Sequence, residues 1–309
     1  MLSLLTLGEC MLELQAPRAV GNENENQAAG INGDLVHSFA GDTYNTAVYA
    51  KRQVPSLNVG FGSVIGRDPF SIKMRKTCES HELDVSLLSV TDSANLGIYA
   101  VTTDSIGEKQ FFYWRKGSAA TQICTLFEAA EWQDSKVGVI YFSGITLAIL
   151  TASNRDIFLQ SLAEKQKQGA RIAFDPNYRA RLWESEAVAK QYIEEAYRLS
   201  DIAFPGLEDH NTMYGHNSYE EINQFLASFN IPEQIIKCDD QGVYICIDNQ
   251  LDCHEAFKPA PKQVDTTAAG DSFAGSYLAS RLAGESAATS VKNATDVARE
   301  VVQHRGAII

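Results

Sequence analysis

Short β-rich runs alternate with longer helical patterns along almost the whole of this 309-residue chain. The β-rich runs cover residues 3–8, 57–63, 137–143, 171–175, 201–204 and 234–237. The clearest helical patterns cover residues 42–53, 69–81, 152–168, 186–198, 218–229, 270–283 and 286–304. Strands that are joined through helices usually pair in parallel, with helices packed on the sheet. The sequence therefore predicts an α/β fold with a mostly parallel central sheet and helices on both faces.

Two regions interrupt this alternation. Residues 10–39 place a polar loop, GNENENQAAGING, between strand-like pieces. Residues 96–115 have the pattern of a β-hairpin, with turn chemistry at 104–108 between alternating aromatic and aliphatic residues. We expect these two segments to form a small β-sheet that acts as a lid over one edge of a single domain, residues 1–309.

The chain is acidic, with a formal net charge of -13 at pH 7 and a pI near 4.9. This charge would repel a phosphate backbone or an anionic lipid surface, so neither nucleic acid nor membrane is expected as a partner. A small anionic substrate is not excluded, because a few local cations can hold it.

The N-terminal run MLSLLTLGECMLEL is apolar but has no basic leader, and Glu9 interrupts it. We expect a first strand there rather than a signal peptide. The longest apolar stretch lies within residues 137–150 and is too short and too interrupted to span a bilayer. The six cysteines include no CxxC pair and are expected to be reduced. These features predict a cytoplasmic protein of ordinary enzyme size.

Several common catalytic motifs are absent from the sequence. It has no GxxxxGK[ST] phosphate loop, no HRD or DFG motif of a protein kinase, no HExxH zinc motif and no GxSxG elbow. Gly60, Gly62 and Gly66 miss the GxGxxG spacing of a dinucleotide-binding fold.

The segment DTTAAGDSFAG, residues 265–275, places small residues and a carboxylate at the start of a helix. A helix N-terminus has unpaired N–H groups, and the small side chains of Ala268, Ala269 and Gly270 would let phosphate oxygens approach them. Asp271 follows in the first turn, where removing a proton from an attacking hydroxyl would explain a carboxylate beside an anion site. The alternative is that Asp265 and Asp271 are only favourable charges at a helix N-terminus.

The longer string DTTAAGDSFAGSYL resembles the C-terminal signature of ribokinase-like (PfkB) carbohydrate kinases, and the resemblance covers essentially the whole chain. Further matching segments are GE at 8–9, AGDTYNTA at 40–47, GSVIGRDPF at 62–70 and KCDDQGVY at 237–244. The resemblance implies a three-layer α/β sandwich with a β-sheet lid, ATP and Mg²⁺ as cofactors, and Asp271 as catalytic base. It also implies that the amides of Ala268, Ala269 and Gly270 form an anion hole.

Other segments are similar to one branch of this family, the 2-keto-3-deoxygluconate kinases. They are GDTYNTAVY at 41–49, YWRKGSAA at 113–120, FDPNYRARLW at 174–183 and the closing RGAII. The similarity implies transfer of the γ-phosphoryl group of ATP to the 6-hydroxyl of a sugar acid, 2-keto-3-deoxygluconate. The alternatives are a kinase for a neutral ketose such as fructose or for a related sugar acid, and a catalytically silent sugar-binding protein.

The substrate residues are expected at three places. Gly41, Asp42 and Asn45 open a helix and could bracket sugar hydroxyls, although an aspartate there could equally be an ordinary N-cap. Tyr99, Tyr113 and Arg115 belong to the hairpin, where Tyr113 and Arg115 share one face. Arg179 follows a strand end at the carboxyl edge of the sheet. With the family resemblance, Arg115 and Arg179 are predicted to hold the carboxylate of the sugar acid.

The nucleotide is expected near Lys237, Asp239 and Gly242, with its phosphates at Ala268 and Gly270. Asp175 and Asn177 offer hard oxygen atoms suited to contacts with Mg²⁺-bound water or phosphate, and Asp175 is the candidate metal ligand. Two positions depart from the family pattern, namely Ala40 in place of a glycine and Gly206 in place of the asparagine of an NxxE motif. The oligomeric state is left open by the sequence, with a homo-oligomer as one option.

Overall fold

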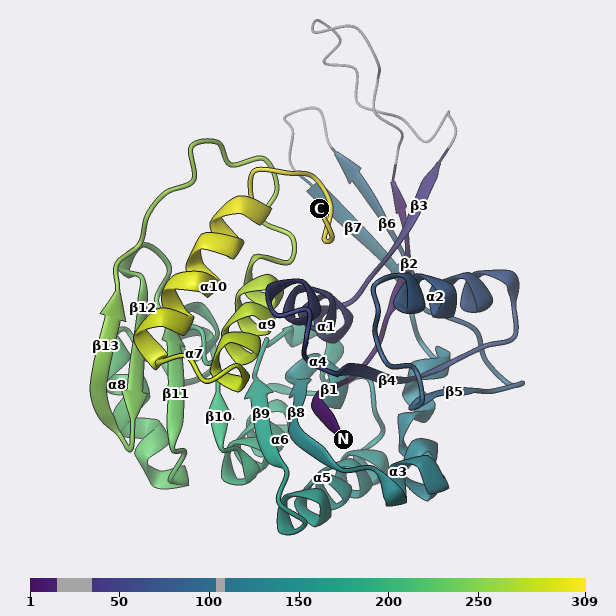
Figure 1. Cartoon of the computed structure of the whole chain (residues 1–309), viewed down its shortest axis with the longest axis horizontal. Helices are drawn as coiled ribbons and strands as arrows, with labels where there is room; N and C mark the ends of the chain where they lie inside the picture. Colours follow the sequence, from purple (N-terminus) through teal and green to yellow (C-terminus); the bar gives the residue numbers. More distant parts are fainter. Residues whose placement is uncertain (16–34, 104–108) are drawn as a thin grey trace, which may run out of the picture.

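The central sheet of the computed structural model has the predicted, mostly parallel arrangement (Figure 1). The structure describes residues 1–15, 35–103 and 109–309. Within these ranges the sheet has the strand order β13-β12-β11-β10-β9-β8-β1-β4-β5. Its strands are β1 (Leu2–Leu7), β4 (Val59–Ile65), β5 (Leu88–Val90), β8 (Val137–Ser143), β9 (Arg171–Asp175), β10 (Ile202–Ala203), β11 (Glu233–Lys237), β12 (Val243–Ile247) and β13 (Gln250–Glu255). Pairing is parallel from β5 to β11, and β12 and β13 add an antiparallel edge.

Helices cover both faces of this sheet (Figure 1). One face carries α1 (Asp42–Gln53), α2 (Pro69–Ser80), α9 (Ala269–Leu282) and α10 (Ala287–Val301). The other carries α3 (Ala130–Asp134), α4 (Gly144–Ala148), α5 (Ala152–Lys167), α6 (Glu186–Leu199), α7 (Leu207–Tyr214) and α8 (Tyr219–Leu226), with the 3-10 turns η1 (Ala119–Glu128) and η3 (Ala227–Phe229). This arrangement confirms the predicted three-layer sandwich.

The two faces hold separate apolar cores. In β8, Val139 and Tyr141 pack with side chains of α1 and α9, whereas Ile140 and Phe142 pack with those of α5 and α6. Successive side chains of a strand point to opposite faces, so a strand between two helical layers must be apolar on both sides. The continuous apolar run of β8 is the sequence signature of this burial.

The helix N-termini differ in how their first N–H groups are satisfied. Five helices, α4, α5, α6, α8 and α10, begin at a serine or threonine whose hydroxyl accepts a backbone N–H of the first turn. By contrast, α1 and α9 begin at Gly41 and Ala268, which have no such side-chain cap. The first N–H groups of these two helices therefore depend on other acceptors: Asp42 accepts that of Thr43 in α1, and the Thr266 carbonyl oxygen accepts that of Ala269 in α9.

Helices α1 and α9 also pack unusually closely. A β-carbon at Gly275 of α9 would lie 2.3 Å from the carbonyl oxygen of Thr46 in α1. The Thr46 hydroxyl contacts the Asp271 carbonyl oxygen, with 3.3 Å between the two oxygen atoms. The absence of a side chain at Gly275 therefore fixes how near the two uncapped helix starts lie to each other.

A second, small sheet stands beside the carboxyl edge of the central sheet (Figure 1). It has the order β3-β2-β6-β7, formed by β2 (Met11–Gln15), β3 (Val36–Ala40), β6 (Ile98–Thr103) and β7 (Lys109–Trp114). The predicted hairpin at 96–115 is confirmed, because β6 and β7 pair antiparallel. The polar loop at 21–33 and the hairpin turn at 104–108 lie outside the described residues. That this small sheet closes as a lid, within one domain of 309 residues, stays a prediction.

Two further observations concern possible membrane spans and the cysteines. Among the residues that the structure describes, no helix has both the length and the apolar character needed to cross a membrane. All six cysteines are free thiols, as the sequence predicted.

Candidate active site

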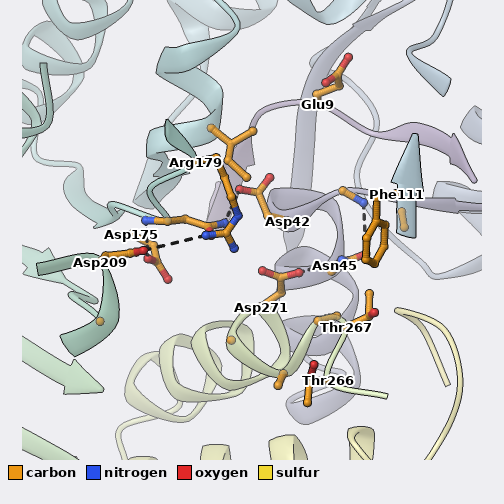
Figure 2. Close-up of a pocket in the computed structure, with 18 of the residues that line it drawn as sticks. Glu9, Asp42, Asn45, Phe111, Asp175, Arg179, Asp209, Thr266, Thr267 and Asp271 are labelled. Carbon is orange, nitrogen blue, oxygen red and sulfur yellow. Dashed lines mark hydrogen bonds and ion pairs between the residues drawn. The ribbon is translucent and has the colours of Figure 1, made fainter. Parts of the chain in front are cut away.

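A cavity of about 550 Å³ lies between the carboxyl edge of the central sheet and the small sheet (Figure 2). The predicted site residues that line it are Gly41, Asp42, Asn45, Tyr99, Tyr113, Arg115, Asp175, Arg179, Lys237, Asp239, Ala268, Ala269, Gly270 and Asp271. Other lining residues, which were not predicted as site residues, include Glu9, Phe111, Arg181, Asp209 and Thr266. The fold therefore brings together in one cavity side chains that the sequence places far apart.

Asp271 lies in the first turn of α9 and faces the cavity. Asn45 of α1 donates a hydrogen bond from Nδ2 to Asp271 Oδ2 over 2.8 Å, as Figure 2 shows. Burial, followed by the nearby Asp42 carboxylate, raises the pKa of Asp271 from its ordinary value to about 7. A carboxylate with a pKa close to neutral is well suited to accept a proton from a hydroxyl.

The start of α9 provides N–H groups beside this carboxylate. Ala268 has a left-handed conformation (φ 62°), which turns the chain sharply into the helix. The Ala269 N–H donates to the Thr266 carbonyl oxygen over 3.2 Å. Within the described residues, the N–H groups of Gly270 and Asp271 have no backbone or side-chain acceptor. The open donors of the predicted anion hole are thus at Gly270 and Asp271, and the N–H of Ala269 is already used.

Asp265 holds the loop that leads into α9. Its Oδ1 accepts the Thr267 N–H over 3.0 Å and the Thr267 hydroxyl over 2.6 Å. Its Oδ2 accepts the N–H of Gly306 over 2.9 Å, which fastens the closing RGAII segment to the same loop. Asp265 is buried and therefore supports the loop from behind, whereas Asp271 faces the cavity.

The start of α1 lies beside that of α9 and lines the neighbouring part of the cavity. A β-carbon at Gly41 would lie 2.0 Å from the Glu9 carbonyl oxygen, so only glycine fits at this crossing. Asp42 is the first helical residue rather than the N-cap. Its carboxylate accepts the Thr43 N–H over 2.9 Å and the Asn177 Nδ2–H over 3.1 Å. Asp42 therefore links α1 to the loop after β9.

Asp175 ends β9 and forms an ion pair with Lys237, which ends β11. Lys237 Nζ lies 2.6 Å from Asp175 Oδ2, and Asp175 Oδ1 accepts the Asn177 N–H over 3.1 Å. Both oxygens of Asp175 are thus engaged by protein donors. In the part of the chain that the structure describes, no group of three or more His, Cys, Asp or Glu side chains is arranged to hold a metal ion. Asp175 as a metal ligand stays a prediction.

Asp209 is a cavity residue at the fourth position of the segment that replaces the family's NxxE motif. Its Oδ2 accepts the Tyr178 N–H over 3.0 Å, and its Oδ1 lies 4.0 Å from Arg179 Nη1. Burial raises the pKa of Asp209 to about 6, partly offset by the hydrogen bond from Tyr178. The segment 204–210 comes directly after β10, and this place at the carboxyl edge was the sequence signal that could have identified Asp209.

Arg115 does not offer a free charge to the cavity. It is ion-paired with Glu9, and both side chains are largely buried, with 11% and 2% of their surface exposed. Ser118 also donates a hydrogen bond to Glu9. Burial raises the pKa of Glu9, and the Arg115 guanidinium opposes this shift. Arg115 lines the cavity as predicted, but its charge is neutralised within the protein, which the sequence did not predict.

Replacing Arg115 with methionine is expected to destabilise the fold by about 3 to 5 kcal/mol, because Glu9 would remain as a buried, unpaired carboxylate. The double variant Glu9→Gln/Arg115→Met should recover most of this loss. The measurement is the free energy of unfolding in urea at pH 7.5 and at pH 5.5. Protonation of Glu9 removes its charge, so the loss in Arg115→Met should be smaller at the lower pH. A single variant as stable as the wild type would contradict the structural role of the pair.

Aromatic rings of the small sheet form the third wall of the cavity. Tyr99 and Tyr113 stack with 5.8 Å between ring centroids, and Phe111 and Tyr113 stack with 6.4 Å between them. The Tyr99 hydroxyl donates to the buried Glu13 and is therefore directed into the sheet. Tyr99 contributes an aromatic surface to the cavity rather than a free hydroxyl.

The predicted nucleotide segment is only partly at the cavity. Lys237 and Asp239 line it, whereas Gly242 does not. Gly242 has a φ of 91°, and a β-carbon there would lie 2.2 Å from the Glu255 carbonyl oxygen. The tight turn between β11 and β12 therefore explains this glycine, and its contact with a nucleotide stays a prediction.

Comparison with known proteins identifies the family. Residues 1–309 match the family described as pfkB family carbohydrate kinase, and the chain belongs to this family. The 2-dehydro-3-deoxygluconokinase of Escherichia coli strain K12 is 35% identical, with 99% of this chain and 96% of the relative covered. A fructokinase from Salmonella typhimurium is 26% identical over 80% of this chain and 78% of its own. The crystal structure of 2-dehydro-3-deoxygluconokinase from Thermotoga maritima has a TM-score of 0.82 at 19% identity, covering 100% of this chain and 96% of that one. The ribokinase-like fold is thereby confirmed.

Proposed function

We propose that this protein is an ATP-dependent 2-dehydro-3-deoxygluconokinase, which phosphorylates the 6-hydroxyl of 2-keto-3-deoxy-D-gluconate. The observation that carries the proposal is the single cavity that Asp271 and the open N–H groups of α9 line together with Arg179 and Arg181. A base with open N–H groups would act on a hydroxyl at one end of the substrate. The two guanidinium groups would bind a carboxylate at its other end. The name of the E. coli relative, at 35% identity over nearly the full chain, supports the same substrate.

The roles of the residues follow from their positions. Asp271 accepts the proton of the attacking hydroxyl, and the hydrogen bond from Asn45 orients its carboxylate. The N–H groups of Gly270 and Asp271 stabilise the charge on the phosphoryl group in transfer, helped by the helix dipole. Lys237 would neutralise phosphate charge from the other side, held in place by Asp175.

Mg²⁺ fits the chemistry of this cavity, because Asp42, Asp175 and Asp209 present carboxylate oxygens, which this ion prefers. Bound with ATP, Mg²⁺ would supply positive charge to the phosphates. With both oxygens of Asp175 engaged, Asp175 and Asp209 would act mainly through the hydration shell of the ion.

The proposal is tested by ADP release with a panel of substrates, followed by ³¹P NMR of the product. The panel contains 2-keto-3-deoxygluconate, gluconate, fructose and ribose. We expect rapid ADP formation with the keto acid and a phosphomonoester at carbon 6. Faster turnover of fructose would favour the neutral-ketose alternative, for which the fructokinase relative is the supporting observation. Binding of a sugar without ADP release in the whole panel would favour a silent sugar-binding protein.

The pH dependence should report the ionisation of Asp271. The base must be ionised to work, and the pKa of Asp271 is raised to about 7 by burial and by Asp42. We therefore expect kcat/KM for the sugar acid to fall about tenfold per pH unit below pH 7 and to level off above it. Among the described residues no histidine lines the cavity. The variant Asp209→Asn removes another cavity carboxyl whose pKa is raised, to about 6, and should keep the transition near pH 7. A flat profile from pH 5 to 8 would contradict the role of Asp271.

The location and assembly of the protein belong to the same proposal. ATP is supplied in the cytoplasm, so we place the reaction there, and cell fractionation would test this. Light scattering against the chain mass of 33.9 kDa would test a homo-oligomer.

A further inference from the structure

The cations that line the cavity differ in whether a carboxylate of the protein neutralises them. Arg115 is paired with Glu9, and Lys237 is paired with Asp175. Arg179 lies 4.0 Å from Asp209. Arg181 is the exception, because it has no carboxylate partner among the residues that the structure describes. An unneutralised guanidinium in a cavity rich in acidic side chains indicates an anionic ligand at that point.

Arg181 also reaches across to the small sheet. It lies in η2 (Ala180–Leu182), its side chain is exposed to the cavity, and its Cζ is 5.5 Å from the centroid of the Tyr113 ring. The aromatic face attracts a guanidinium while leaving its N–H edge free for other acceptors. The ring of Tyr113 thus orients Arg181 without satisfying its hydrogen-bond donors.

The segment that carries Arg181 is anchored from behind. Trp183 is buried, and the guanidinium of Arg155 lies over its ring with 4.9 Å from Cζ to the centroid. Arg155 is itself only 1% exposed and donates to both oxygens of Glu184 over 3.0 Å. Trp183 and Glu184 directly follow η2, so their contacts with Arg155 restrict the positions that Arg181 can adopt. A residue that binds a ligand has to be held in place in this way.

We propose that Arg181 is a specificity-determining residue that binds the carboxylate of the sugar acid, in the role that the sequence gave to Arg115. This inference rests on the proposed function. Planar, paired N–H donors match a carboxylate in two-point contact. Because Arg181 is not neutralised by the protein, a neutral sugar would leave its charge uncompensated beside Tyr113.

The test compares Arg181→Met, Arg181→Lys and the wild type, with 2-keto-3-deoxygluconate and fructose as substrates and ATP at saturation. Arg171→Met is the matched control, because Arg171 is exposed at the opposite end of β9. Loss of charge-assisted hydrogen bonds should raise KM for the keto acid in Arg181→Met by about 10- to 150-fold. The values of kcat and of KM for ATP should change less than about threefold, and the residual rate with fructose should not fall. Arg181→Lys should recover part of the loss, and Arg171→Met should behave as the wild type.

Three outcomes would overturn the inference. The first is a change in KM for the keto acid below about threefold in Arg181→Met. The second is an equal fall in kcat/KM with the keto acid and with fructose. The third is a rise in KM for ATP, which would instead assign Arg181 to the phosphates. If the wild type does not phosphorylate the keto acid, the proposed function fails and the inference fails with it. If the wild type does so and Arg181→Met matches it, only the inference fails. Unfolding temperatures of all variants establish that each is folded.

Discussion

Replacing Asp271 with asparagine is expected to lower kcat by about 10² to 10⁴, the usual effect of removing a general base. Asparagine has nearly the same shape and can still accept the hydrogen bond from Asn45, so the start of α9 should keep its geometry. The amide cannot take up the proton of the attacking hydroxyl, and the chemical step is slowed. ATP affinity should be unchanged or slightly higher, because one negative charge near the phosphates is removed.

Single-turnover kinetics and nucleotide binding by calorimetry would measure these effects. Asp134→Asn is a suitable control, because it makes the same chemical change at an exposed position of α3. The folded state disfavours the ionised form of Asp271, since burial raises its pKa to about 7. At pH 8 the variant should therefore be at least as stable as the wild type. A variant that retains near wild-type kcat would show that another group accepts the proton.

The wild-type protein is expected to prefer 2-keto-3-deoxygluconate over fructose by about a thousandfold or more in kcat/KM. Charge-assisted hydrogen bonds to a carboxylate contribute roughly 1.5 to 3 kcal/mol each. Arg179 and Arg181 both line the cavity and are exposed to it. A neutral sugar leaves these donors without their partner, which penalises it further. The net charge of -13 strengthens the need for local cations, because the field of the whole protein repels the anionic substrate.

Initial rates with both substrates, at matched ATP concentration, give this ratio directly. Arg179→Met should reduce this ratio, because kcat/KM for the keto acid should fall more than kcat/KM for fructose. Arg198→Met, at an exposed position of α6, is the corresponding control. If the wild type uses fructose as efficiently as the keto acid, a carboxylate site in this cavity is excluded and the neutral-ketose alternative takes its place.

Much of the fold could be predicted because the apolar patterns are strong. Runs such as β8 are buried on both faces, and they predicted parallel strands in a sandwich. Strands β5, β12 and β13, at or next to the edges of the central sheet, were not predicted. Strand β13 is mostly exposed, and β5 is only three residues long, so neither of these two produces a long apolar run.

The site could be predicted at the level of its residues but not of their pairing. Asp271, Asn45 and Lys237 were identified from local patterns and from the family resemblance, and the structure places them in one cavity. The Arg115–Glu9 ion pair joins the end of β7 to the segment after β1, and no local pattern predicts such a contact. Arg181 was missed because it lies only two residues after Arg179 in the same motif, and the spacing does not show which of the two arginines has a carboxylate partner.

The close packing at Gly275 has a consequence for mutational libraries of this protein. Gly275 does not line the cavity, so a library designed around the ligand would leave it out. Even alanine there would meet the Thr46 carbonyl oxygen and would separate α1 from α9. That separation would stretch the hydrogen bond from Asn45, which is the only one that the Asp271 carboxylate accepts from a side chain among the described residues. In a selection for catalysis, position 275 should therefore behave as an active-site position, whereas in a selection for expression alone it should tolerate small residues better.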